Sequence, residues 1–141
     1  MKRMHVHLGV RDLDTSIAFY SELFSAAPVV RKPDYAKWLL DDPRLNFAIS
    51  QGHDHSGIAH LGLQAEDTDE LREIYGRLQR AEQPVLEEGQ TTCCYSRSEK
   101  SWTADPDGVK WEVFHTHGEA TTYGNPAPLV PASAATGACC G

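Results

Sequence analysis

Apolar and polar positions follow the same order twice between residues 4 and 117. One short strand-like run starts at His5 and another at His60, and each leads to an aspartate, Asp12 or Asp67, suited to cap a helix. After each aspartate, apolar residues recur with the period of an α-helix. The residues concerned are Leu13, Ile17, Tyr20 and Phe24 in the first segment and Leu71, Ile74, Tyr75 and Leu78 in the second. The pattern indicates an internal repeat.

Short strand candidates follow each predicted helix and are separated by turn residues. They cover 29–32, 35–40 and 45–50 in the first half, and 85–87, 93–97, 101–104 and 110–115 in the second. The run Asp105-Pro106-Asp107-Gly108 predicts a tight turn, because proline presets one central residue and glycine tolerates the conformation that follows. We therefore expect an α+β fold in which the order of one strand, one helix and three strands occurs twice along the chain, with 51–57 as the joining loop.

The repeat and a change of composition divide the chain into a domain and a tail. We expect one domain over 1–117, with module one at about 1–52 and module two at about 58–117. From residue 118 onward Gly, Ala, Pro, Ser and Thr dominate, and Glu119 is the only charged residue. This composition predicts a flexible tail over 118–141. The chain has 141 residues, of which 40% are hydrophobic, and can therefore bury an ordinary core.

The charge balance narrows the classes of partner. The formal net charge is -7, from 20 acidic and 13 basic residues, and such a field repels phosphate backbones and anionic lipid surfaces. We therefore expect neither nucleic acid nor a membrane as a partner. Lys2 and Arg3 open the chain, but no apolar stretch long enough for a signal peptide or a membrane span follows them. A cytoplasmic monomer or homodimer is expected.

Three residues have the character of metal ligands. His5 and His60 occupy equivalent places in the repeat, and Glu112 lies in the apolar run Trp111-Glu112-Val113-Phe114, where a carboxylate is costly to bury without a cation. Two imidazoles and one carboxylate form a facial triad, the ligand set that holds iron(II) and leaves open positions. Taken singly, each histidine fits a hydrogen-bonded core residue equally well, and the glutamate fits a solvent-facing one.

Five further histidines lack this repeat-matched position and are interpreted as structural or solvent-facing. They are His7, His53, His55, His115 and His117. His7 shares a strand face with His5, since alternate residues of a strand point the same way, and so it is a spare imidazole near the predicted site.

The four cysteines form two adjacent pairs, Cys93-Cys94 and Cys139-Cys140. Neighbouring cysteines bridge only through a strained ring, and a reducing cytoplasm keeps thiols free. Each is either a small buried apolar side chain or a soft metal ligand. The segment 90–101 around the first pair is predicted either as a lid or as a solvated hairpin. Its Arg97 or Lys100 either lowers the pKa of a thiol or is an ordinary surface charge.

These motifs resemble the vicinal oxygen chelate superfamily, which includes glyoxalase I, extradiol dioxygenases and bleomycin-resistance proteins. The resemblance covers about residues 4 to 115 and rests on His5, the segment Asp12 to Tyr20, His60 and Asp105-Pro-Asp-Gly-Val-Lys-Trp-Glu112. It implies two tandem βαβββ modules in a half-open mixed β-barrel around one metal, held by His5, His60 and Glu112. Glyoxalase I has a further glutamate ligand where this chain has Ala48, and three protein ligands suit oxygen chemistry better than that isomerase.

The vicinal cysteines narrow the resemblance to the bacterial carbon–arsenic lyases of the superfamily and, more distantly, to the cadmium-induced proteins. Retention of His5 favours the lyases, because the cadmium-induced relatives can lack this histidine. The resemblance implies an iron(II) enzyme with molecular oxygen as co-substrate, which cleaves the carbon–arsenic bond of a trivalent organoarsenical, such as methylarsenite or an aromatic arsenical, to arsenite. Cys93 and Cys94 would bind the arsenic, and Cys139 and Cys140 would be auxiliary thiols.

Two other functions remain open at this point. A cysteine-based cadmium or arsenic binding protein would need the thiols and not the triad. An extradiol ring-cleaving dioxygenase would need the triad and not Cys93 or Cys94.

Overall fold

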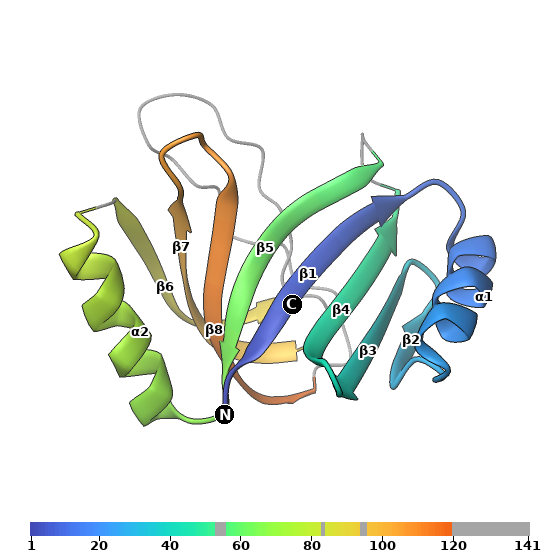
Figure 1. The fold of residues 1–141 in the computed structure, drawn as a ribbon, viewed down its shortest axis with the longest axis horizontal. Helices are drawn as coiled ribbons and strands as arrows, with labels where there is room; N and C mark the ends of the chain where they lie inside the picture. Colours follow the sequence, from blue (N-terminus) through green and yellow to red (C-terminus); the bar gives the residue numbers. More distant parts are fainter. Residues whose placement is uncertain (53–55, 83, 94–95, 120–141) are drawn as a thin grey trace.

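The computed structural model describes residues 1–52, 56–82, 84–93 and 96–119. Two helices and eight strands form in this part of the chain (Figure 1). In the first half they are β1 (Arg3–Val10), α1 (Leu13–Phe24), β2 (Val30–Lys32), β3 (Tyr35–Asp41) and β4 (Arg44–Gln51). In the second half they are β5 (Gly57–Ala65), α2 (Thr68–Arg80), β6 (Val85–Cys93), β7 (Ser96–Ala104) and β8 (Lys110–Glu119). The structure confirms the predicted order of one strand, one helix and three strands in each half of the chain.

The eight strands form one open, mixed sheet in the order β2-β3-β4-β1-β5-β8-β7-β6. Each half has the same internal pairing, because β1 lies parallel to β4 and β5 lies parallel to β8. The halves join through the antiparallel pair β1 and β5, the two strands that carry the repeat-matched histidines. The expected α+β fold of two βαβββ modules in a half-open arrangement is confirmed.

The helices lie at the two flanks of the curved sheet (Figure 1). Asp12 caps α1 by accepting a hydrogen bond from the Thr15 backbone, and Asp67 caps α2 by accepting one from Glu70 at 2.8 Å. The Glu70 carboxylate reaches back to the backbone N–H of Glu66, one residue before the position of an ordinary capping box. Both predicted helix starts are therefore confirmed.

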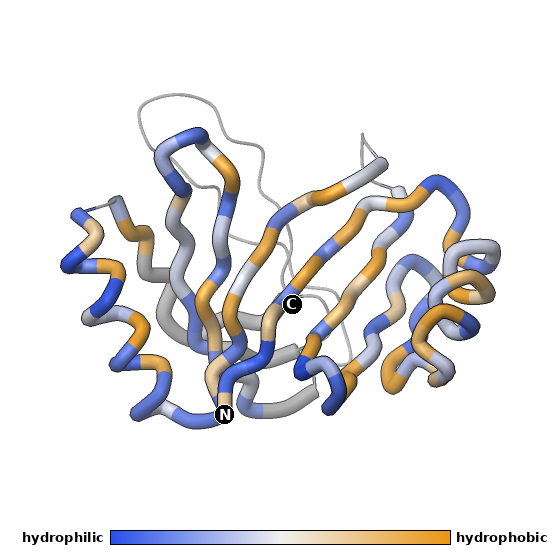
Figure 2. The backbone as a smooth tube through the Cα atoms, in the orientation of Figure 1, coloured by the Kyte–Doolittle hydropathy of each residue, from blue (hydrophilic) through white to orange (hydrophobic). Residues whose placement is uncertain are grey.

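Each helix covers its own half of the sheet with a separate apolar core. The core under α1 contains Leu13, Ile17, Ala36, Trp38, Phe47 and Ile49, with Tyr20 and Phe24 packed against it. The core under α2 contains Ala65, Leu71, Ile74 and Val113, with Tyr75 and Leu78 packed against it. Hydropathy alternates along the central strands (Figure 2), so one sheet face supports these cores and the other is left for polar residues.

The second half differs in detail from the strands expected from sequence. The candidates 85–87 and 93–97 are not separate strands, because β6 runs continuously from Val85 to Cys93 and β7 begins at Ser96. The backbone of the polar segment between these candidates pairs with β7 instead of forming a loop, whereas sequence periodicity alone predicted a break there. β8 continues to Glu119, and residues 120–141 of the predicted tail lie outside the described residues.

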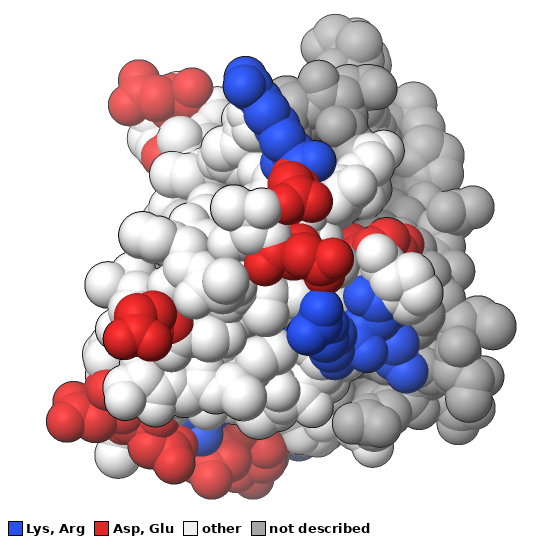
Figure 3. Space-filling view, turned by 90° about the vertical axis from the view of Figure 1, so that its right-hand side faces the viewer, with Lys and Arg blue, Asp and Glu red and all other residues white. Residues whose placement is uncertain are grey.

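Charged side chains are mixed on the surface that Figure 3 shows. Among the described residues on this face, basic groups lie beside acidic ones instead of gathering into a broad basic patch. Ion pairs between exposed side chains occur in the described part of the chain, and Arg31 and Asp14, 2.9 Å apart, form one of them. Within the described ranges, neither helix is long and apolar enough to cross a membrane.

Candidate metal centre

The face of the sheet opposite the helices, here called the inner face, brings the predicted ligands together. His5 and His7 alternate with the apolar residues of β1 and are both buried, at 0% and 1% exposure. His60 projects from β5 and Glu112 from β8, also buried. Strand register places His5 opposite Gly62 of β5, and Gly62 in turn beside Glu112 of β8. Three strands far apart in sequence thus deliver their polar side chains to one row.

His5, His60 and Glu112 converge at their side-chain tips. The Nε2 atoms of His5 and His60 lie 3.1 Å apart. The Glu112 Oε2 atom lies 3.2 Å from His60 Nε2 and 3.6 Å from His5 Nε2. Ligand atoms bound to one metal ion at about 2.0–2.2 Å lie at this kind of mutual separation. The structure therefore brings together all three residues expected from the repeat and the Glu112 motif.

The hydrogen bond on the far side of His5 fixes which nitrogen faces the cluster. The His5 Nδ1–H donates to the backbone carbonyl of Asn46 at 3.1 Å, so Nε2 presents its lone pair. The Asn46 amide in turn donates to Gln64 Oε1 at 3.0 Å, which ties β4 to β5. This is the outer support that metal-binding imidazoles commonly have.

The local electrostatics keep the His5 imidazole neutral and the Glu112 carboxylate ionised. Burial, with the neighbouring His60 as a further cause, lowers the pKa of His5 to about 3, so its imidazole is neutral near pH 7. Burial raises the pKa of Glu112, but the His60 hydrogen bond and the Lys100 charge outweigh it and hold the pKa well below the usual range. The Lys100 Nζ atom lies 3.3 Å from Glu112 Oε1, and both side chains are fully buried. The interpretation of Lys100 as a solvent-facing charge is wrong.

The donor set fits a divalent cation. The lone pair of His5 Nε2, the Glu112 carboxylate and His60 Nε2 point at one buried spot, where His60 can supply only one proton. The buried Nδ1 atom of His60 has no hydrogen-bond partner among the described residues. A metal ion bound by Nε2 would satisfy the converging acceptors, and two imidazoles with one carboxylate suit iron(II).

Aromatic side chains enclose the cluster. The Phe114 ring meets His5 edge to face at a centroid distance of 5.2 Å, and Trp102 meets His60 at 4.9 Å. Both rings are buried, so they replace water beside the imidazoles. Such a dry wall strengthens the electrostatic interactions inside the site.

His7, which the sequence interpretation set aside, also lies in the cluster. Its ring centroid is 5.0 Å from that of His60 and 6.3 Å from that of His5, and its Nε2 atom lies 2.8 Å from Ser50 Oγ. The same-face spacing from His5 was the available signal. Beside His7, β4 presents Ala48, so this position supplies no carboxylate.

The cysteines expected to bind substrate fall almost entirely outside the described part of the chain. Cys93 is the last residue of β6, and only its backbone is described. Cys94, Cys139 and Cys140 lie outside the described residues. The assignment of these thiols to substrate stays a prediction.

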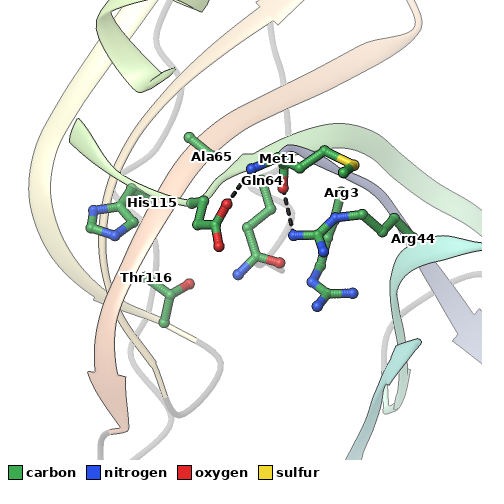
Figure 4. Close-up of a pocket in the computed structure, with 8 residues that line it drawn as sticks. Met1, Arg3, Arg44, Gln64, Ala65, His115 and Thr116 are labelled. Atoms are coloured by element: carbon green, nitrogen blue, oxygen red, sulfur yellow. Dashed lines mark hydrogen bonds and ion pairs between the residues drawn. The ribbon is translucent and has the colours of Figure 1, made fainter. Parts of the chain in front are cut away.

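A separate hollow of about 180 Å³ lies where β1 begins (Figure 4). It is lined by Met1, Arg3, Arg44, Gln64, Ala65, Glu66, His115 and Thr116. Much of its polar lining is engaged within the protein, because the Met1 amine donates to Glu66 and Arg44 donates to the Met1 carbonyl. None of these lining residues belongs to the converging set of His5, His60 and Glu112.

An open sheet built from two βαβββ modules, with imidazoles and a carboxylate on its inner face, defines the class of this protein. Residues 2–113 match the family model of the Glyoxalase/Bleomycin resistance protein/Dioxygenase superfamily, and the chain belongs to this superfamily. An extradiol ring-cleaving dioxygenase from B. fuscum has the same fold, with a TM-score of 0.60 over 84% of this chain and 33% of that chain. At 13% identity, this likeness concerns the fold alone.

Relatives of known name narrow the comparison. The chain is 47% identical over 121 residues to the trivalent organoarsenical cleaving enzyme of Bacillus sp. strain MD1, covering 82% of this chain and 74% of the relative. It is 34% identical over 126 residues to a cadmium-induced protein of Mycobacterium bovis, covering 89% of this chain and 83% of that protein. Both groups of relatives expected from the sequence motifs are confirmed.

Proposed function

We propose that this protein is an iron(II)-dependent enzyme that cleaves the carbon–arsenic bond of trivalent organoarsenicals, with molecular oxygen as co-substrate and arsenite as product. The observation that carries the proposal is the meeting of His5 Nε2, His60 Nε2 and Glu112 Oε2 within 3.6 Å of one another in a buried site. The 47% identity to an organoarsenical cleaving enzyme supports the substrate class.

His5, His60 and Glu112 would hold the iron. The ion, when bound, supplies open positions and redox chemistry for oxygen and substrate. The residues around it keep the ligands in place: the Asn46 carbonyl orients His5, and Lys100 holds the outer oxygen of Glu112. Phe114 and Trp102 exclude water from the imidazoles. The protein's role is positioning and exclusion of side reactions.

Cys93 and Cys94 would bind the arsenic atom. Trivalent arsenic is a soft centre, and two adjacent thiolates can chelate it and leave its carbon bond exposed. A reducing cytoplasm keeps such thiols free, so we propose the cytoplasm as the compartment. Cys139 and Cys140 would serve as an auxiliary pair that captures substrate.

The overall reaction balances without a further reductant. One methylarsenite and one dioxygen together contain the atoms of one arsenite and one formaldehyde, so the methyl carbon is oxidised and oxygen is reduced. The bond between carbon and arsenic breaks, and new carbon–oxygen and arsenic–oxygen bonds form. One oxygen molecule should therefore be consumed for each arsenite released.

The test is arsenite release from methylarsenite by anaerobically purified, iron(II)-loaded protein, with and without oxygen. We expect oxygen-dependent release that is lost in Glu112→Ala and kept in Glu22→Ala, which removes an exposed carboxylate of α1. Iron content is measured for each variant, so that loss of metal and loss of turnover are recorded separately. Tight arsenical binding without release, equal in wild type and Glu112→Ala, would refute the enzyme.

A soft-metal binding protein is the second candidate, favoured by the likeness to the cadmium-induced protein. In that case the cysteines would hold cadmium or arsenic, and His5, His60 and Glu112 would be dispensable. Cadmium affinity unchanged in Glu112→Ala, together with absent arsenite release from wild type, supports this alternative. A ring-cleaving activity would appear as catechol turnover that survives replacement of Cys93 and Cys94 by serine.

A further inference from the structure

His7 is a buried imidazole of the cluster that the proposed mechanism does not use. One ring nitrogen of each of His5, His7 and His60 lies within 4.8 Å of those of the other two. Strand register explains the proximity, because His7 and His60 are direct partners across the antiparallel pair of β1 and β5. Cross-strand partners have their side chains on the same face, side by side.

We propose that His5, His7 and His60 form a second metal-ligand set, which shares two imidazoles with the predicted iron triad and takes zinc(II) in preference to iron(II). Three imidazoles around one ion, with a fourth position left for water, are a ligand set characteristic of zinc. A nitrogen-only set also favours zinc over iron(II) by ligand type and by the general order of metal affinities. The two sets cannot be filled together, since each needs His5 and His60.

The surroundings of His7 suit a ligand. Its Nε2 atom lies 2.8 Å from the Ser50 hydroxyl, which fixes the orientation of the ring. Metal-binding histidines commonly have such an outer partner, and its loss typically weakens metal binding about 10- to 100-fold. The side chain is 1% exposed, so bulk water does not compete for the ring.

The charge arrangement allows the set to work without Glu112. The Glu112 carboxylate has its own cationic partner, because Lys100 Nζ lies 3.3 Å from Glu112 Oε1. Zinc bound by the three imidazoles alone would therefore not leave Glu112 as an unpaired buried charge, and it is unpaired buried charges that destabilise a protein. The chain can therefore hold a divalent ion with or without its carboxylate ligand.

The consequence for turnover rests on the proposed function. Zinc in the His5, His7 and His60 set would withdraw two ligands from iron, and so zinc would inhibit arsenite release in competition with iron(II). The binding inference itself needs no turnover and is tested on metal affinity alone.

The experiment measures zinc(II) affinity by competition with a chromophoric chelator, and cobalt(II) coordination by its visible spectrum. We expect Glu112→Gln to keep zinc affinity within about tenfold of wild type, because three imidazoles remain. Adding His7→Asn to Glu112→Gln should weaken zinc binding by a further factor of about 100 or more and change the cobalt spectrum. His117→Asn, which removes a partly exposed histidine of β8, is the matched control and should change neither.

Ser50→Ala keeps every imidazole and guards against a folding defect in the His7 variant. It should weaken zinc binding by about tenfold in the Glu112→Gln background, through loss of the orienting hydroxyl. The inference is overturned if Glu112→Gln abolishes zinc binding as completely as His5→Ala does. It is equally overturned if His7→Asn leaves zinc affinity and the cobalt spectrum unchanged in folded Glu112→Gln protein. Arsenite release by iron-loaded wild type is scored separately, so failure of the proposed enzyme does not decide this result.

Discussion

Gly62 lies between two predicted ligands, and replacing it by alanine should open the site. A Cβ built at Gly62 would lie 2.4 Å from the backbone oxygen of Glu112 and 3.3 Å from Cδ2 of His5. Ordinary contacts between such atoms begin near 3.5 Å, so β5 and β8 must separate locally by about 1 Å. The obstructing atom belongs to the backbone, and no side-chain rotation can relieve the contact.

The cost follows from this overlap. Forcing an extra methyl group into a packed site typically costs about 1–3 kcal/mol of unfolding free energy. For a domain of this size, such a loss corresponds to a fall in Tm of roughly 4–12 °C. The same shift moves Glu112 relative to His5 and His60, and a 1 Å displacement of a positioned group can lower turnover by about 100-fold.

The assays are urea denaturation of the metal-free protein and titration with iron(II) or cobalt(II). Gly76→Ala is the matched control, because it makes the same chemical change in α2, where the nearest atom to the new Cβ is Arg80 Nη1 at 3.6 Å. Alanine is a better helix former than glycine, so this variant should gain up to about 1 kcal/mol. Wild-type stability and unchanged metal affinity in Gly62→Ala would refute the argument that Gly62 is needed for the close approach.

Three further predictions concern charge, pH and helix capping. Lys100→Met removes the buried partner of Glu112 and should lower the unfolding free energy of the metal-free protein by about 3–5 kcal/mol. Bound metal should then raise the Tm of this variant more than the Tm of wild type, and an equal rise in both would contradict the role of Lys100. The metal-free protein should lose stability as the pH falls from 6.5 to 5, by at most about 1.4 kcal/mol per pH unit. The reason is that folded His5, with a pKa of about 3, stays neutral in this range, whereas the same residue in the unfolded chain takes up a proton near pH 6.5. Urea titrations at several pH values should show a shallower slope for His5→Gln, and an unchanged slope would count against the cause. Asp67→Ala removes the hydrogen bond to the Glu70 backbone and should lower stability by about 1 kcal/mol without changing metal affinity, as measured by denaturation and metal titration.

Local features of the fold could be predicted because they depend on neighbours in sequence. The α1 and α2 helices follow from apolar periodicity and from the caps Asp12 and Asp67. The equivalence of His5 and His60 follows from the repeat. The boundary between β6 and β7 was not predictable in this way, because their polar residues gain strand structure from pairing across the sheet.

The members of the cluster were only partly predictable for the same reason. His7 and Lys100 carry no motif, and each acquires its environment from a strand distant in sequence. His7 meets His60 through the pair β1 and β5, and Lys100 meets Glu112 through the pair β7 and β8. A histidine beside an apolar residue and a lysine in a polar run give no sign, by themselves, of full burial.

The sequence by itself determined the repeated order of elements, the helix caps, the two equivalent histidines and the carboxylate in an apolar run. Each depends on spacing along the chain, which residue periodicity records directly. The tertiary structure alone decided that β1 lies beside both β4 and β5 and that β5 lies beside β8. These pairings place His5, Gly62 and Glu112 in one row and add His7 and Lys100 to its surroundings, because long-range strand register fixes which side chains share a face.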